Sequence, residues 1–292
     1  DVTELNLAYY NTGGINLDGT IPHSIGNLRS LTHLRLNQSK LGGTIPESMG
    51  NLQKLRLLWL WNNQLEGEIP DTLYTIKTMY EFAVYSNNLG GTISEKIGNW
   101  TNLGHLWLRF NNFTGTLPES MINLTKLHHL IIGWNNFSGE IPAFLGELRS
   151  LTHLHANSNE FSGSIPSSIG NLTNLRELQF QFNNLTGEIP ASIGDLRSLR
   201  TLYLYSNNLE GNIPSSLGNL QNLTHLEISL NNFTGEIPLS LGNLSNMVWF
   251  SIHTNQLTGS IPDTLRNLTK VQTFSVDNNN LQGTIPNWQF DF

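Results

Sequence analysis

Two tryptophans stand two residues apart in the segment LRLLWLWNNQLEGEIP, residues 55–70. Trp59 and Trp61 alternate with Leu58 and Leu60, so in an extended segment the tryptophans face away from the leucines. Aromatic rings beside a guanidinium group can bind apolar groups of a ligand together with a carboxylate, and they can also stack on sugar rings. Equivalent outward positions along the chain form a candidate ligand-binding set: Trp59, Trp61, Tyr85, Trp107, Arg109, Phe110, Trp134, Phe182, Tyr203 and Tyr205.

Histidine recurs at another outward position, where it raises the question of a metal site. Imidazoles on neighbouring strands can ligate a metal ion. However, the phrase LTHL occurs verbatim at residues 31, 151 and 223, so histidine belongs partly to a repeated pattern. We therefore predict no metal site and no cofactor for the row His33, His105, His129, His153 and His225.

The elements that position these residues follow from an internal repeat of 24 residues. All 11 prolines fall at one position of this repeat, where the fourth copy has Ser94 instead. The first copy, residues 2–30, is longer, and the last, residues 271–292, is incomplete. No linker interrupts the series, so we predict one domain over residues 1–292 with about twelve repeats. Full copies begin at Leu31, Leu55, Met79, Leu103, Leu127, Leu151, Leu175, Leu199, Leu223 and Met247.

Each repeat carries a pattern with a direct physical meaning. The LxxLxL phrase predicts one short strand per repeat, with leucines inward and variable residues outward. The asparagine three places after the strand, as at Asn111 and Asn135, is predicted to bind backbone groups of a buried turn and to stack from repeat to repeat. Glycine allows a tight backbone path, and proline suits the return side of the coil. Stacked repeats then share one core, as in a solenoid.

The phrase LxxLxLxxNxLxGxIPxxLGNLxx resembles the plant-specific leucine-rich repeat, found in ectodomains of receptor-like kinases and in polygalacturonase-inhibiting proteins. The resemblance implies an α/β-type, right-handed superhelix with a concave parallel sheet and a mostly irregular or 3-10 convex side. It also implies an extracellular, non-catalytic domain that binds a peptide or protein on its concave face, with a co-receptor as a further partner. The alternative is a carbohydrate-binding or cell-wall-enzyme inhibitor protein.

Composition excludes several other classes of function. The net charge of −7 disfavours nucleic acid, and no apolar run reaches the roughly 18 to 20 residues that span a bilayer. The first residues, DVTELNLAYY, do not predict a signal peptide. Acid–base pairs, phosphate loops and nucleophile motifs are not apparent, so we predict no enzyme. Repeated N-x-S/T sequons, among them Asn112 and Asn136, fit a glycosylated protein outside the cell.

The outward positions vary from repeat to repeat, whereas the framework positions hardly change. This contrast is typical of a tailored contact surface, and it differs from the regular threonine or asparagine rows expected of an ice-binding surface. We place the centre of the site on repeats three to six, around Arg109, where Gly104 and Gly133 are expected to leave a recess. At the C-terminal end, Trp288, Phe290 and Phe292 are predicted to cover the last core layer.

Overall fold

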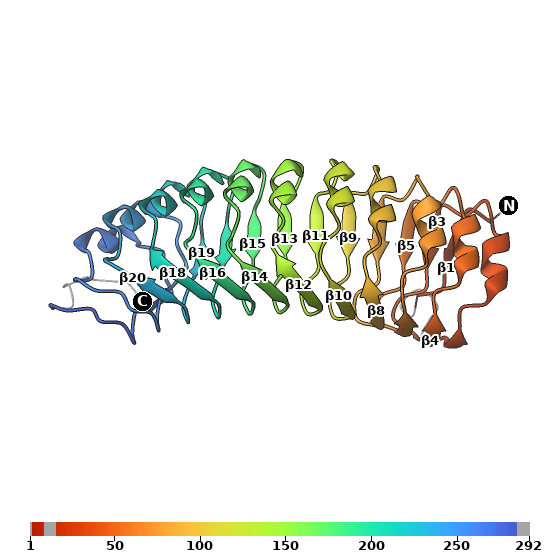
Figure 1. Ribbon diagram of the computed structural model, residues 1–292, viewed down its shortest axis with the longest axis horizontal. Helices are drawn as coiled ribbons and strands as arrows, with labels where there is room; N and C mark the ends of the chain where they lie inside the picture. Colours follow the sequence, from red (N-terminus) through yellow and green to blue (C-terminus); the bar gives the residue numbers. More distant parts are fainter. Residues whose placement is uncertain (1, 9–15, 285–292) are drawn as a thin grey trace. The chain divides into compact units, whose positions relative to one another are not determined.

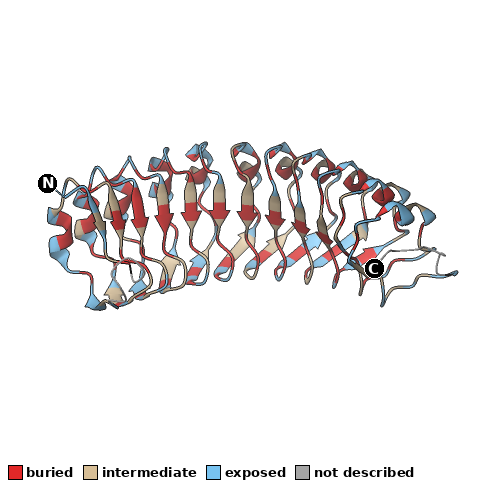
Figure 2. Ribbon diagram, turned by 180° about the vertical axis from the view of Figure 1, so that it is seen from behind, coloured by how far each residue is buried: buried red, intermediate tan, exposed pale blue. Residues whose placement is uncertain are grey.

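Each LxL segment forms a three-residue strand, as the alternating pattern predicts. In the computed structural model, which describes residues 2–8 and 16–284, strands such as His33–Arg35 and His105–Trp107 have a buried middle residue between two half-buried residues on the outward side. Leu34 and Leu106, for example, are 0% and 1% exposed. Figure 2 shows this alternation along the strands. The predicted C-terminal cover of Trp288, Phe290 and Phe292 lies outside the described residues.

The chain divides into two compact units, residues 1–138 and 139–292, and each is described by itself (Figure 1). The single domain over residues 1–292 therefore stays a prediction. Within each unit the strands pair in parallel with a shift of one repeat, so that His105 lies opposite Glu81 on one side and His129 on the other. This register brings equivalent positions of successive repeats into rows across the sheet.

Unit 1 contains a first sheet built from the predicted strands. Its strands, in order across the sheet, are β1 (Glu4–Asn6), β3 (His33–Arg35), β5 (Leu57–Trp59), β7 (Glu81–Ala83), β9 (His105–Trp107) and β11 (His129–Ile131). Unit 2 contains the equivalent strands β13 (His153–His155), β15 (Glu177–Gln179), β17 (Thr201–Tyr203), β19 (His225–Glu227), β21 (Trp249–Ser251) and β22 (Thr273–Ser275).

A second strand in most repeats was not predicted, so the expectation of one strand per repeat is wrong. These strands pair in parallel in each unit and precede the return side of the coil. The sequence of β6, QLEG at residues 64–67, contains a single buried leucine and a glycine with positive φ, Gly67 at 77°. Such segments have low strand propensity, so only backbone bonds to the next repeat reveal them. They are β2 (Asp18–Thr20), β4 (Lys40–Thr44), β6 (Gln64–Gly67), β8 (Asn88–Thr92), β10 (Asn112–Gly115), β12 (Asn136–Glu140, across the unit boundary), β14 (Glu160–Gly163), β16 (Asn184–Gly187), β18 (Asn208–Asn212) and β20 (Asn232–Thr234).

The return side of the coil consists of short 3-10 helical turns, as the sequence analysis predicted for the side opposite the strands. Each turn follows the proline position; Pro46, with φ −67°, is in extended conformation directly before η3. Gly50 must be glycine, because a Cβ there would lie 2.6 Å from the backbone oxygen of Thr72 in the next turn. The turns are η2 (His23–Asn27), η3 (Glu47–Asn51), η4 (Asp71–Thr75), η5 (Glu95–Asn99) and η6 (Glu119–Asn123) in unit 1, and η7 (Ala143–Glu147), η8 (Ser167–Asn171), η9 (Ala191–Asp195), η10 (Ser215–Asn219), η11 (Leu239–Asn243) and η12 (Asp263–Asn267) in unit 2.

The predicted asparagine ladder is confirmed. The side-chain Nδ2 of Asn111 donates to the backbone oxygens of Leu108 (3.0 Å) and of Val84 in the preceding repeat (2.9 Å). Its Oδ1 accepts from the backbone N–H of Leu89 (3.0 Å). Asn111 is only 7% exposed. One amide thus satisfies three backbone groups that the coil would otherwise bury unpaired.

Candidate functional site

The ten predicted ligand-binding residues lie on the outward side of the first sheets and at the turns that follow their strands. Trp59, Trp107 and Tyr203 end the strands β5, β9 and β17. The remaining residues come two or three positions after a strand. Trp59, Trp61, Tyr85, Trp107, Arg109, Phe110 and Trp134 belong to unit 1, and Phe182, Tyr203 and Tyr205 belong to unit 2.

A row of aromatic rings crosses the outward face of unit 1. The rings of Trp61 and Tyr85 are stacked, with centroids 5.0 Å apart and planes 9° apart. Tyr85 contacts Trp107 edge to face at 6.3 Å, and Trp107 stacks on His129 at 6.2 Å. All of these side chains except the histidine come from the predicted set. The rings are half-buried, so their contacts fix them in place while one surface stays accessible.

His105 and His129 belong to this aromatic row, which the sequence analysis did not recognise. Their rings are 4.5 Å apart, and His105 also contacts the ring of Tyr80 at 5.4 Å. The available signal was that His105 shares a strand and a face with Trp107. Among residues 2–8 and 16–284, no group of three or more histidine, cysteine, aspartate or glutamate side chains is arranged to hold a metal ion.

Trp59 is held differently, by charged neighbours. Its Nε1–H donates to Glu81 Oε1 at 2.8 Å, and the guanidinium of Arg35 lies 5.0 Å from its ring centroid. Burial raises the pKa of Glu81, while the bond from Trp59 and the charge of Arg35 act in the opposite direction. Trp59 therefore serves partly to position Glu81.

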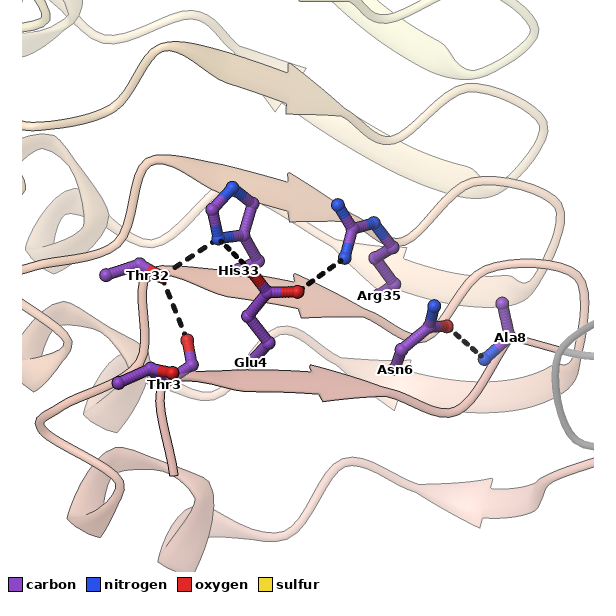
Figure 3. A network of polar contacts seen from close by, with 7 residues as sticks. All are labelled: Thr3, Glu4, Asn6, Ala8, Thr32, His33 and Arg35. Atoms are coloured by element: carbon purple, nitrogen blue, oxygen red, sulfur yellow. Dashed lines mark hydrogen bonds and ion pairs between the residues drawn. The ribbon is translucent and has the colours of Figure 1, made fainter. Parts of the chain in front are cut away.

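Arg35 is itself neutralised by an acidic side chain, as Figure 3 shows. Glu4 on β1 lies between His33 and Arg35 on β3, with both ion-pair distances at 3.6 Å. The hydroxyl of Thr32 donates to the backbone oxygen of Thr3 at 2.9 Å and ties the two strands together. The first two strands thus present a polar, charge-balanced surface beside the aromatic row.

Arg109 is not neutralised in this way. No carboxylate lies within 4.0 Å of it in the described part of the chain, residues 2–8 and 16–284. Its guanidinium stacks on the ring of Phe110 at 4.4 Å, its Nε is buried without a partner, and burial lowers its pKa. A half-buried cation with no counter-ion favours an anionic group from outside. Phe110 in turn contacts Trp134, with ring centroids 5.4 Å apart.

Phe110, Trp134 and Phe182 occupy strained turn positions rather than strand positions. Each has φ near 56°, in the left-handed region that bulky residues rarely adopt. The same slot holds residues such as Asn62 or Ser86 in other repeats. The repeat geometry imposes this conformation, and a large side chain there costs roughly 1 to 2 kcal/mol. Strain of this kind is common at functional sites, and the three rings are 42%, 46% and 48% exposed.

The recess expected at Gly104 is not open. A Cβ at Gly104 would lie 2.6 Å from Cε2 of Tyr80, so the ring of Tyr80 already covers this glycine. The sequence prediction was wrong here because it considered the missing side chain of Gly104 but not the long side chain of the preceding repeat. Glycine is required for the position of Tyr80 and leaves no gap beside Arg109.

The outward face of unit 2 has fewer ring contacts and more carboxylates. Tyr205 contacts Phe182 at 5.0 Å and Tyr203 at 6.1 Å. The carboxylate Oε2 of Glu177 lies 2.9 Å from His155 Nε2. Burial raises the pKa of Glu227. Burial and the charge of Glu227 also raise the pKa of Tyr203. This face therefore already contains the negative groups that the surroundings of Arg109 lack.

Comparison with known proteins identifies the family of this chain. The family model described as "Leucine-rich repeat region" matches residues 86–189, and the model "Leucine Rich Repeat" matches residues 30–52, 54–76, 198–220 and 222–244. The chain belongs to the leucine-rich-repeat family. It has the plant-type repeat, and its structural relatives are mostly ectodomains of plant receptor kinases. A search of curated proteins gave no match.

Three solved structures show the range of similarity. The plant peptide hormone receptor RGFR1, in complex with RGF2, has 36% identity and a TM-score of 0.91 over 97% of this chain and 47% of that one. The Arabidopsis receptor kinase HAESA, in complex with the peptide hormone IDA and the co-receptor SERK1, has 28% identity and a TM-score of 0.65 over 98% and 63%. A plant ice-binding protein has 25% identity and a TM-score of 0.69 over 89% and 84%. The chain thus spans about half the length of RGFR1.

No helix within residues 2–8 and 16–284 is both long and apolar enough to cross a bilayer.

Proposed function

We propose that this leucine-rich-repeat chain is an extracellular, non-catalytic recognition domain whose unit 1 binds a peptide or protein carrying an acidic group. The observation that carries the proposal is Arg109, a half-buried guanidinium that stacks on Phe110 and has no carboxylate partner in the described residues. The aromatic row of Trp61, Tyr85 and Trp107 lies on the same outward face. Aromatic and arginine side chains of this kind usually dominate a binding interface.

The similar receptors support the choice of ligand. RGFR1 and HAESA are receptors of peptide hormones, and HAESA is also seen with a co-receptor. We extend peptide binding, and a co-receptor as second partner, to this chain as part of the proposal. The other outward positions fit a peptide better than ice, because the row Trp59, Ala83, Trp107 and Ile131 has no regular repeat of small hydroxyl groups. Oligosaccharide binding is the rival outcome of the test below.

The test begins with a screen of acidic peptides, their neutral amide analogues and cell-wall oligosaccharides against the intact chain. For a ligand that binds, Trp107→Ala and Arg109→Ala should each weaken affinity by about 2 kcal/mol or more. The melting temperature should hardly change, because neither side chain belongs to the core. The matched control is Trp249→Ala, a tryptophan that is 39% exposed on the first sheet of unit 2. We expect little effect there for a ligand that contacts unit 1 alone.

Arg109→Lys separates the role of charge from that of geometry. Lysine keeps the charge but loses the planar fork that binds a carboxylate through two parallel bonds. We expect it to recover only part of the affinity for an acidic peptide and none for the neutral amide analogue. Full affinity after removal of both Trp107 and Arg109 would disprove the proposed site. A preference for neutral oligosaccharides would replace the peptide by the carbohydrate alternative.

A further inference from the structure

The segments that lead into four consecutive strands of unit 1 carry basic residues and no acidic ones. Four consecutive repeats lead into their strands through residues 52–56, 76–80, 100–104 and 124–128, and these segments contain no aspartate or glutamate. They contain Lys54, Arg56, Lys77 and Lys126. In a protein with a net charge of −7, this separation makes these segments locally attractive to anions.

A pocket lies among these segments, outside the predicted site. Arg56, Thr78, Tyr80, Asn102 and Lys126 line it. Arg56 and Lys126 belong to segments three repeats apart, which is about 14 Å at the usual strand spacing of roughly 4.8 Å. Because both side chains are long and both line the same pocket, they enclose it from opposite ends.

The polar groups of the pocket are arranged so that donors remain available. The Nζ of Lys126 donates to Asn102 Oδ1 at 2.8 Å, and Asn102 Nδ2 donates to the backbone oxygen of Lys77 at 3.0 Å. A lysine ammonium has three donors, so Asn102 orients Lys126 and leaves two of them for a ligand. Within residues 2–8 and 16–284, neither Arg56 nor Lys126 has a carboxylate within 4.0 Å.

One wall of the pocket is aromatic and is held in place. The ring of Tyr80 is 41% exposed, lies over Gly104 and contacts the ring of His105 edge to face at 5.4 Å. Its hydroxyl is 3.4 Å from His105 Nε2. Any side chain at Gly104 would displace this ring. Gly104 therefore allows Tyr80 to form the wall of this pocket, although it leaves no recess of its own.

We propose that this pocket binds an oxyanion, namely a sulfate, phosphate or carboxylate group carried by the ligand of unit 1. The inference rests on the proposed function for the identity of the ligand, but the pocket can be tested without it. Arg56 precedes Trp61 by five residues, or about 17 Å at roughly 3.3 Å per residue. A peptide with one acidic group at Arg56 and apolar groups on the aromatic row would therefore lie along the strands.

The experiment titrates the intact chain with sodium sulfate and sodium phosphate at constant ionic strength, followed by NMR. Tyrosine O-sulfate, tyrosine O-phosphate and glutarate are further probes that distinguish the three sources of negative charge. We expect saturable binding of at least one probe. Arg56→Gln and Lys126→Gln should each weaken it about tenfold, as for loss of a charge-assisted hydrogen bond. Both side chains are exposed, so the variants should fold, and their melting temperatures verify this.

Lys270→Gln is the matched control. Lys270 Nζ donates to Asn246 Oδ1 at 2.7 Å, as Lys126 does to Asn102, and Arg200 stands at the position of Arg56, but Thr224 replaces the aromatic wall of Tyr80. This variant removes the same charge and bond and should leave affinity unchanged within about twofold. Equal losses at Lys126 and Lys270, or binding that never saturates, would overturn the proposal by showing only general attraction.

The experiments distinguish failure of the anion pocket from failure of the ligand site on the aromatic row. Trp107→Ala should leave the binding of the small anions intact, because Trp107 does not line the pocket. If the anions bind and Trp107→Ala has no effect on a peptide ligand, the pocket stands and the proposed function of the aromatic row fails. If the anions do not bind, the pocket is refuted whatever the aromatic row does.

Discussion

The outward faces of units 1 and 2 have the same backbone and opposite chemistry. In unit 1, rings contact one another in a row, and Arg109 has no carboxylate within 4.0 Å among residues 2–8 and 16–284. In unit 2, Glu177 pairs with His155, and Glu227 lies close enough to Tyr203 to raise its pKa. The first face therefore offers an acidic ligand a cation without a described carboxylate partner, whereas the second already holds carboxylates beside its tyrosines and histidines. Because the framework is the same, the difference comes only from the variable positions of the repeat.

Substitutions in the shared framework should change the free energy of unfolding the most. The change should be equal in the two units. Asn135→Ala in unit 1 and Asn207→Ala in unit 2 each remove an amide that binds buried backbone groups, such as the oxygens of Leu108 and Leu204. Each change should lower the free energy of unfolding by about 1 to 3 kcal/mol, measured by chemical denaturation.

The control for the ladder is the next residue along the chain. Asn136 is exposed, so Asn136→Ala should change the free energy of unfolding by less than about 0.5 kcal/mol. Similar losses for Asn135→Ala and Asn136→Ala would contradict the assignment of the ladder. Markedly different losses for Asn135→Ala and Asn207→Ala would show that the frameworks of the two units are not equivalent.

The strained turn positions predict an intermediate effect that separates the units. Leu230 in unit 2 has φ 54° and is 44% exposed, whereas Phe110 in unit 1 has φ 56° and contacts Trp134 and Arg109. Asparagine tolerates this backbone conformation, so Leu230→Asn should raise the free energy of unfolding by about 1 kcal/mol.

Phe110→Asn relieves the same strain but also removes two contacts, so its gain should be smaller. Both variants can be measured by denaturation under identical conditions. The difference between them reports the free energy of the Phe110 contacts. A destabilised Leu230→Asn variant would mean that backbone strain at this position is not significant. Strain at Phe110 would then no longer indicate a functional site in unit 1.

The smallest effect concerns buried carboxylates and depends on pH. Burial raises the pKa of Glu227, so the folded protein binds its proton more tightly than the unfolded chain does. The resulting stability is present below the unfolded pKa and is lost as pH rises through the folded pKa. At pH 7, Glu227→Gln should therefore raise the free energy of unfolding slightly, by less than about 0.5 kcal/mol, and the gain should vanish below about pH 4.

Glu81→Gln is the counterpart in unit 1. Burial raises the pKa of Glu81 too, but Trp59 and Arg35 stabilise its ionised form. We expect a smaller gain than at Glu227, in thermal denaturation at several pH values. An equal gain at both positions would show that the surroundings of Glu81 give no net stabilisation of its charge.

The sequence by itself determined the framework. The 24-residue period, the LxL alternation, the proline position and the asparagine at Asn111 and Asn135 predicted the strands, the 3-10 side and the polar ladder. These features can be predicted from the sequence because each depends on contacts between equivalent positions of neighbouring repeats. The same contact therefore recurs in successive repeats. The second strand found in most repeats was missed because backbone hydrogen bonds, rather than side-chain alternation, define it.

The contacts of the variable residues became apparent only in the three-dimensional structure. Sequence could place Trp107, Arg109 and Tyr80 on one face, but it could not show that the ring of Tyr80 covers Gly104 or that no described carboxylate pairs with Arg109. It also could not show that Lys126 and Arg56 line one pocket. Long side chains reach across one or two repeats, so their partners depend on rotamers and packing that no periodic pattern encodes. The backbone geometry repeats, whereas contacts such as that of Trp59 with Glu81 or of Arg109 with Phe110 depend on the particular side chains of their repeats.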